Sequence, residues 1–108
     1  MIARTPEPPY YAVIFSSLRT AADEAGYAAM TRLMEELAAE QPGYLGIESA
    51  RSSLGLTISY WRDEASIRAW RENLRHAAAQ RLGKERWYEA YQVRVAKVER
   101  AYGMSEGG

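Results

Sequence analysis

Three side chains within one predicted helix could carry chemistry: Trp70, Asn73 and His76. At about 100° per residue, Asn73 and Gln80 fall about 60–80° to one side of Trp70, and His76 falls about 120° away. The apolar stripe that contains Trp70 is therefore bordered by two amides and an imidazole. Because an imidazole titrates near neutral pH and binds iron, His76 could act as a general base or as a metal ligand.

Each of these three residues also has a purely structural explanation. A lone histidine on a helix is commonly solvated, and a helix asparagine is commonly hydrated. Trp70 could wall a pocket or donate a proton, but it could equally be part of the core. Asn73 could donate a hydrogen bond to an oxyanion. The sequence leaves both explanations open for all three.

The elements that must position these side chains follow from the spacing of apolar residues. Residues 56–61 alternate as a strand does, and Asp63 stands at the N-cap of the helix, which Gly83 ends. Pro42 and Gly43 stop an earlier helix, and residues 52–55 form a hairpin loop. The remaining predicted elements are a strand over 10–18, a helix over 23–41, a strand over 44–51 with a possible bulge at Gly46, and a strand over 91–101.

The predicted order is β-α-β-β-α-β, the ferredoxin-like α+β fold with a four-stranded antiparallel sheet. Two helices can cover only one face of such a sheet. Residues 10–18 are apolar on both parities, so the second face should also be covered. A second copy of the chain could cover it symmetrically, and we therefore expect a homodimer that a charge at Val13 or Val93 would split.

Composition excludes several classes of protein. The 108 residues suit one domain, with an extended lead over 1–9, the folded part over 10–102 and a disordered tail over 103–108. The 14 basic and 14 acidic residues balance, which gives no sign of nucleic-acid binding. There is no cysteine, no metal-ligand spacing and no apolar run that could span a membrane. The first residues lack the charged region and apolar core of a signal peptide, so we expect none. We expect a cytoplasmic protein whose partners are itself and a small molecule.

Several stretches together resemble the antibiotic biosynthesis monooxygenase family: GYLGIESAR, SYW, AWRENLRHAAAQ and GKERWYEAYQVRVAKVER. The resemblance covers about residues 10–102 and implies a dimeric α+β barrel. It also implies a cofactor-independent oxygenase, in which the anion of a quinol-type substrate gives an electron to dioxygen. Trp70 and His76 look like the helix tryptophan and the polar donor of such enzymes.

Heme-degrading members of the family offer an alternative, with heme as the cofactor. They use an asparagine at the end of the first strand, together with a tryptophan and a histidine on the second helix. This chain has Ser16 and Ser17 in place of that asparagine, so we expect no heme degradation. A third possibility is a dimer that binds a small ligand without catalysis.

The predicted pocket lies between the sheet and the helices. We expect Trp70, Asn73 and His76 to bound it on the helix side as the catalytic group, with Phe15 and Tyr60 on the strand side. Trp61 and Trp87 should also bind substrate, near the ends of the barrel. Such an apolar wall with few polar groups suits a small aromatic substrate.

Overall fold

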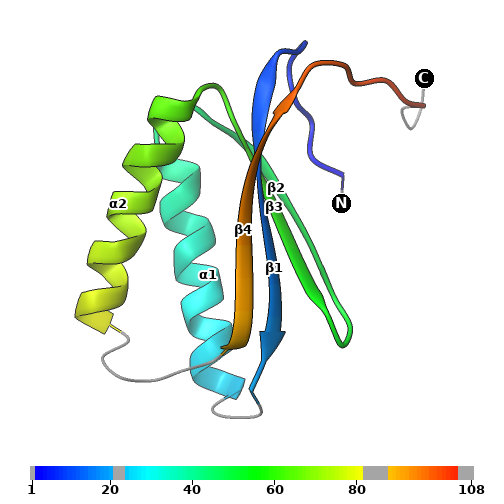
Figure 1. Cartoon of the computed structure of the whole chain (residues 1–108). Coiled ribbons are helices and arrows are strands. Elements are labelled where there is room, and N and C mark those ends of the chain that lie inside the picture. Colours follow the sequence, from blue (N-terminus) through cyan, green and yellow to red (C-terminus); the bar gives the residue numbers. More distant parts are fainter. Residues whose placement is uncertain (1, 21–23, 82–87, 105–108) are drawn as a thin grey trace.

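The computed structural model describes residues 2–20, 24–81 and 88–104, without the side chains of residues 24–27, 30, 75–81 and 88. Its element order is β-α-β-β-α-β, so the predicted ferredoxin-like α+β fold is confirmed (Figure 1). The elements are β1 (Tyr10–Arg19), α1 (Glu24–Glu40), β2 (Tyr44–Arg51), β3 (Gly55–Trp61), α2 (Glu64–Arg81) and β4 (Tyr88–Val98).

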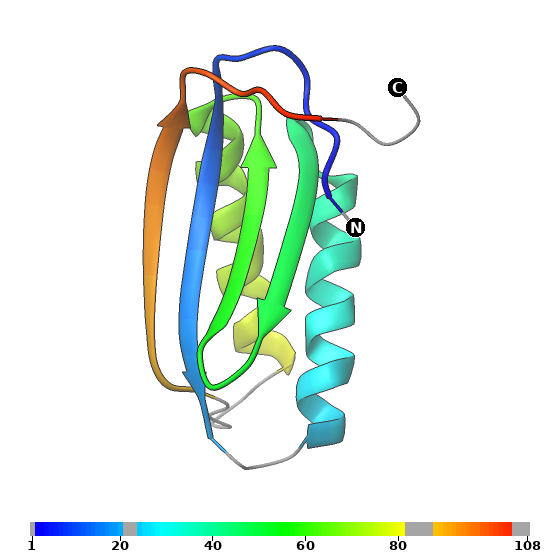
Figure 2. The same ribbon diagram turned by 90° about the vertical axis from the view of Figure 1, so that its right-hand side faces the viewer.

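The four strands form one antiparallel sheet in the order β2-β3-β1-β4. Both helices lie on the same side of this sheet (Figure 1). Helix α1 packs on β2 and α2 on β3. Figure 2 shows that neither of these helices lies behind β4. The sheet therefore has a helix side that is covered unevenly and an open side without helices.

Strand register decides which side each residue faces, and it corrects two of our expectations. Tyr11 pairs with Trp61 and Phe15 with Thr57, whereas Ala12 pairs with Tyr60. Side chains alternate along a strand, so Phe15 lies on the helix side and Tyr60 on the open side. One pocket cannot have both side chains as walls, so Tyr60 does not bound a pocket on the helix side, where Phe15 lies.

The same register places Val13 and Val93 on the helix side. Val13 packs against the core, and Val93 pairs with Phe15. Our choice of these two valines for the interface between copies was therefore wrong. The open side instead carries Ile14, Leu18, Leu56 and Ile58.

The core gathers where α2 crosses β3. Trp61 is fully buried and packs with Trp70, Ile67 and Ala38, which are also buried. The indole N–H of Trp61 donates to Ser59 Oγ at 2.8 Å, so the buried polar atom is satisfied. A large aromatic centre of this kind holds α2 in a fixed position over the sheet.

The start of α2 is fixed by the predicted N-cap. The backbone N–H of Ser66 donates to Asp63 Oδ1 at 2.8 Å. This bond and the one to the Ser66 hydroxyl hold the pKa of Asp63 below its usual value.

The predicted irregularity at Gly46 is also present, as a register shift between β2 and β3. Neither helix, over the residues described, has the length and apolar composition that a membrane span requires.

The lead before β1 lies on the open side of the sheet. The backbone N–H of Ala3 donates to Glu48 Oε2 at 2.9 Å, and Thr5 Oγ1 donates to the Tyr10 hydroxyl at 2.9 Å. Tyr10 is buried as a result. We call residues 2–9 the N-terminal strap. It covers one end of the open side, whereas Leu18, Leu54 and Leu56, near the β2–β3 hairpin, remain exposed.

Candidate functional site

The helix side of β4 presents an exposed apolar surface. Tyr91, Val93 and Val95 are 64%, 46% and 49% exposed. The ring of Tyr91 lies 5.5 Å from that of Phe15, with 32° between the ring planes. We call Phe15, Tyr91, Val93 and Val95 the β4 shelf. Contiguous exposed apolar surface of this kind commonly marks a place where something binds.

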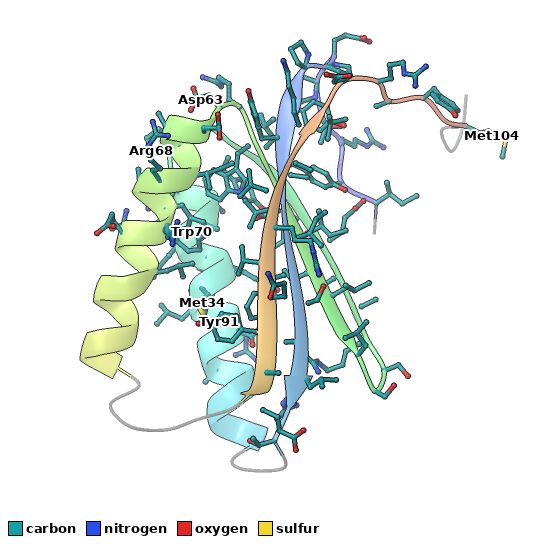
Figure 3. All side chains as sticks on the ribbon, in the orientation of Figure 1. Met34, Asp63, Arg68, Trp70, Tyr91 and Met104 are labelled. Atoms are coloured by element: carbon teal, nitrogen blue, oxygen red, sulfur yellow. The ribbon has the colours of Figure 1, made fainter. Side chains whose placement is uncertain are left out.

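Trp70 and Trp61, both predicted to contact substrate, belong to the core. Figure 3 shows Trp70 on the side of α2 that faces the sheet, whereas Arg68 points away from it. The Trp70 indole stacks on Trp61 at a centroid distance of 5.9 Å. On the other side, Tyr44 meets Trp61 edge to face at 5.7 Å. Both indoles are buried, so these two tryptophans could support a pocket wall from behind.

Asn73 joins the two helices. Its side-chain amide donates to Gln41 Oε1 at 2.9 Å and to the Ala69 carbonyl at 3.2 Å. Gln41 in turn donates from Nε2 to the Leu37 carbonyl at 3.4 Å, at the end of α1. Asn73 is therefore engaged in helix–helix packing, which differs from the oxyanion donor that we had predicted.

Tyr60 takes part in a different cluster, on the open side. Its hydroxyl donates to Glu48 Oε1 at 2.7 Å, and its ring meets Tyr10 edge to face at 5.9 Å. Burial, together with this hydrogen bond to the carboxylate, raises the pKa of Tyr60 to about 12. The cluster anchors the N-terminal strap and lies on the other face of the sheet from the β4 shelf.

Two predicted residues lie outside what the structure describes. Trp87 is outside the described residues, and of His76 only the backbone, within α2, is described. Position 76 follows Trp70 by six residues, about 9 Å along the helix axis. Helix α2 begins three residues after Trp61, so position 76 lies farther along the helix from its start than Trp70 does.

A row of four residues across the helix side was missed by sequence reasoning. Arg51 pairs with Gly55, Gly55 with Ser17, and Ser17 with Tyr91, one from each strand. Arg51 Nη2 donates to Ser17 Oγ at 2.6 Å, so its side chain passes over β3 at Gly55. Ser17 is only 2% exposed. Gly55 had been interpreted as a turn residue alone, and only the register shows that its missing side chain leaves room for Arg51.

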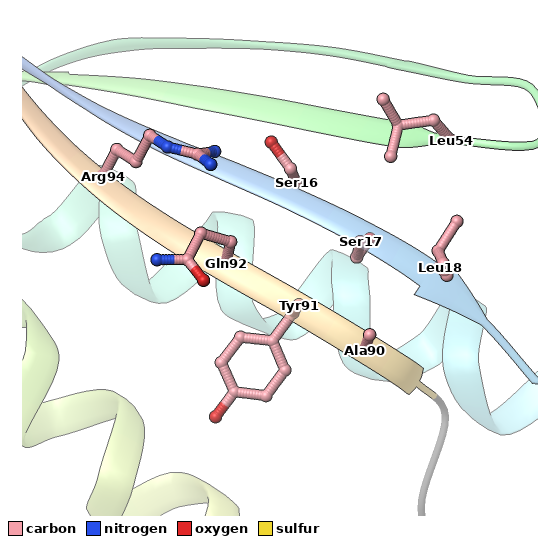
Figure 4. Close-up of a pocket in the computed structure, with 8 residues that line it drawn as sticks. All are labelled: Ser16, Ser17, Leu18, Leu54, Ala90, Tyr91, Gln92 and Arg94. Atoms are coloured by element: carbon pink, nitrogen blue, oxygen red, sulfur yellow. The ribbon is translucent and has the colours of Figure 1, made fainter.

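A shallow hollow of about 270 Å³ lies at the same end of the sheet (Figure 4). Arg94 and Ser16 face each other across it on the open side, whereas Tyr91 points the other way. Leu18 and Leu54 complete its apolar part.

Among the described residues, no group of three or more His, Cys, Asp or Glu side chains could hold a metal ion.

The comparison with protein families agrees with the fold. The sequence profile described as antibiotic biosynthesis monooxygenase matches residues 9–82. The chain belongs to this family. It is also 50% identical over 101 residues to the uncharacterized protein YqjZ of Bacillus subtilis, a match that spans 92% of this chain and 88% of YqjZ.

Two solved structures share the fold at low sequence identity. SnoaB of Streptomyces nogalater, a cofactor-independent oxygenase, superposes with a TM-score of 0.67 at 15% identity, over 87% of this chain and 97% of SnoaB. A point mutant of MhuD, with two manganese protoporphyrin IX bound per active site, superposes with a TM-score of 0.65 at 19% identity, over 87% of this chain and 99% of MhuD. One fold thus accommodates both a cofactor-free reaction and a porphyrin.

Proposed function

We propose that this protein is a cofactor-independent monooxygenase that acts on a small aromatic or quinol-type substrate, bound on the helix side of the sheet against the β4 shelf. One observation carries the proposal: Tyr91 on β4 is exposed, its ring lies 5.5 Å from that of Phe15 on β1, and neither described helix lies behind β4. Paired aromatic rings with exposed valines beside them suit a flat apolar ligand. Membership of the family and the likeness to SnoaB support the type of reaction.

In the proposed reaction, the protein binds the substrate and excludes water from it, and the substrate itself supplies the electrons for the reduction of dioxygen. His76 takes the phenolic proton, and the resulting anion gives an electron to dioxygen. One oxygen atom enters the product and the other leaves as water. The quinol supplies the electrons and protons that are needed to form this water. The apolar shelf lowers the hydration of the anion and so favours electron transfer. Trp61 and Trp70 hold α2, and therefore position 76, over the sheet.

Oxygen uptake with a panel of small hydroquinones tests this proposal. We expect His76→Ala to lower turnover by roughly 10²–10⁴-fold, the usual contribution of a general base, without loss of fold. Tyr91→Ala should raise KM more than it lowers kcat, because it removes binding surface and leaves the base in place. Arg68→Ala is the control, since Arg68 lies on the outer side of α2. Oxygen uptake unchanged by His76→Ala would remove the imidazole from the mechanism, and no uptake with any hydroquinone would favour a binding module.

Association of two copies through the open side is part of the same proposal. The exposed Leu18, Leu54 and Leu56 form an apolar end that the N-terminal strap leaves uncovered. A symmetric contact between two such ends would remove them from water. The strap already covers Tyr10 within one chain, so the contact would centre on the hairpin end of the sheet.

Heme binding has less support from the residues described. Heme iron takes an axial histidine, cysteine, methionine or tyrosine. The chain has no cysteine, so His76, a methionine or a tyrosine would have to supply this ligand. The first strand carries Ser16 and Ser17 where heme-degrading relatives have asparagine.

A further inference from the structure

We infer that the substrate carries an acidic group, and that Arg51 binds it at the end of the β4 shelf. This inference rests on the proposed function, because it adds a charged subsite to the apolar surface described above. It concerns the row Arg51–Gly55–Ser17–Tyr91, whose members come from four different strands and face the same side.

The first step is the placement of the guanidinium. Arg51 belongs to the edge strand β2, yet its Nη2 reaches Ser17 Oγ on β1 at 2.6 Å. Neighbouring strands are about 4.8 Å apart, so the Arg51 side chain extends across β3 and places its guanidinium at β1, next to β4, which bears Tyr91. Ser17 is buried, and a buried hydroxyl that accepts this bond holds the guanidinium in one position.

The second step is the role of Gly55. A Cβ at this position would collide with Nη2, Cζ and Nε of Arg51. Gly43 and Gly46 have positive φ angles, whereas Gly55 does not. Backbone conformation therefore does not require glycine at position 55. The space that it leaves is filled by the arginine.

The third step is the match between charge and aromatic surface. Phe15 is two residues before Ser17 on the same face, about 7 Å along β1, and Tyr91 is one strand away from Ser17. A ring lying against Phe15 and Tyr91 would bring a carboxylate on that ring within reach of the guanidinium. Arginine binds carboxylates through two parallel N–H donors, which also fixes the orientation of the ring. The geometry selects a dihydroxybenzoate-like acid over a neutral hydroquinone.

Equilibrium binding tests the inference without turnover. Isothermal titration calorimetry in the absence of oxygen would compare 2,5-dihydroxybenzoate with its methyl ester at pH 7. We expect the wild-type protein to bind the acid about five- to tenfold more tightly, as for a partly exposed, charge-assisted contact. Arg51→Gln and Gly55→Ala should both reduce this preference to less than twofold. Gly55→Ala keeps the guanidinium of Arg51 but displaces it. Comparison of the two variants therefore shows whether the position of the charge matters as well as its presence.

Arg94→Gln is the matched control, because Arg94 is exposed on the opposite face of the sheet, and it should leave the preference unchanged. Thermal unfolding of each variant checks that it folds. Equal affinity of the wild type for acid and ester, a preference that survives Arg51→Gln, or no binding of either compound would each overturn the inference. Oxygen uptake with the ester separates the two proposals: turnover without acid preference retains the oxygenase, and acid preference without turnover retains the subsite alone.

Discussion

The indole of Trp70 on α2 stacks on that of Trp61 on β3, with ring centroids 5.9 Å apart and 26° between the ring planes. Both side chains are buried, and Trp61 is completely so. Since α2 also carries position 76, the pair fixes how far that position stands from the sheet. A change at Trp70 would therefore shift position 76 through packing alone.

The first prediction concerns this tryptophan pair. Trp70→Ala should lower the free energy of unfolding by about 3–5 kcal/mol, because it leaves a large cavity against Trp61. Trp70→Phe should cost much less, since a ring still fills most of the space. Urea unfolding followed by circular dichroism measures both. If Trp70→Ala left stability unchanged and removed only activity, the side chain would act on substrate and the packing role would be wrong.

The second prediction concerns the contact between Asn73 and Gln41. The bond is exposed, so Asn73→Ala should lower the free energy of unfolding by only about 0.5–1.5 kcal/mol. Removal of Gln41 should have a similar effect, and the double variant should cost less than the sum. Oxygen uptake should remain within a fewfold of wild type. A loss of roughly 10²-fold or more in kcat with normal stability would instead restore Asn73 as an oxyanion donor.

The third prediction is a pH dependence. The folded-state pKa of Tyr60 is about 12, above its ordinary value of 10.0, so the folded protein holds the proton more tightly than the unfolded chain does. The stabilisation from this phenol is therefore complete below about pH 10 and is lost as pH rises from about 10 to about 12. Solvent screening limits the loss to the order of 1 kcal/mol. The difference between wild type and Tyr60→Phe in urea unfolding should shrink over this range. A constant difference would contradict the shifted pKa.

The fourth prediction tests association through the open side. Leu56→Asp should convert a dimer into a monomer, because burying an unpaired carboxylate costs several kcal/mol. Val95→Asp is the matched control: Val95 is similarly exposed but lies on the helix side, so the dimer should persist. Light scattering after gel filtration gives the mass of each. A wild-type protein that is monomeric at micromolar concentration would exclude this contact.

The fifth prediction is that heme is not turned over. The reason is Ser16–Ser17 in the place of the asparagine of heme-degrading relatives. Absorbance in the Soret region after addition of heme and a reductant should not decay faster than in a protein-free sample. Decay that depends on the protein and is abolished by His76→Ala would contradict the prediction and favour the heme alternative.

The sequence was sufficient to predict the order of the elements, although β4 runs over Tyr88–Val98 and was predicted over 91–101. It was insufficient to predict which residues face each side of the sheet. Asp63 was predicted as an N-cap and Gly46 as a possible bulge, because both depend on local backbone chemistry. Phe15 belongs to a strand that is apolar on both parities and Tyr60 to an alternating strand, and neither pattern tells which parity meets the helices. That depends on register with another strand, which a single sequence does not contain.

The contacts of Arg51 and of the N-terminal strap were unpredictable for a related reason. Residues 51 and 17 are 34 positions apart, and their contact exists only because β3 places a glycine between them. The prolines of the lead predicted extended chain, but they gave no indication that Ala3 would bond to Glu48. Long-range contacts of this kind follow from the assembled sheet.

The absence of a side chain at position 55 links the sequences of two strands. In a relative with alanine or a larger residue at this position, an arginine at position 51 would have to leave the path that it takes across the sheet here. The two positions should therefore covary: glycine at 55 should accompany a long basic residue at 51, and a bulkier residue at 55 should accompany a short one. Ligand preference in such a family could then change through one substitution at a residue that touches no ligand.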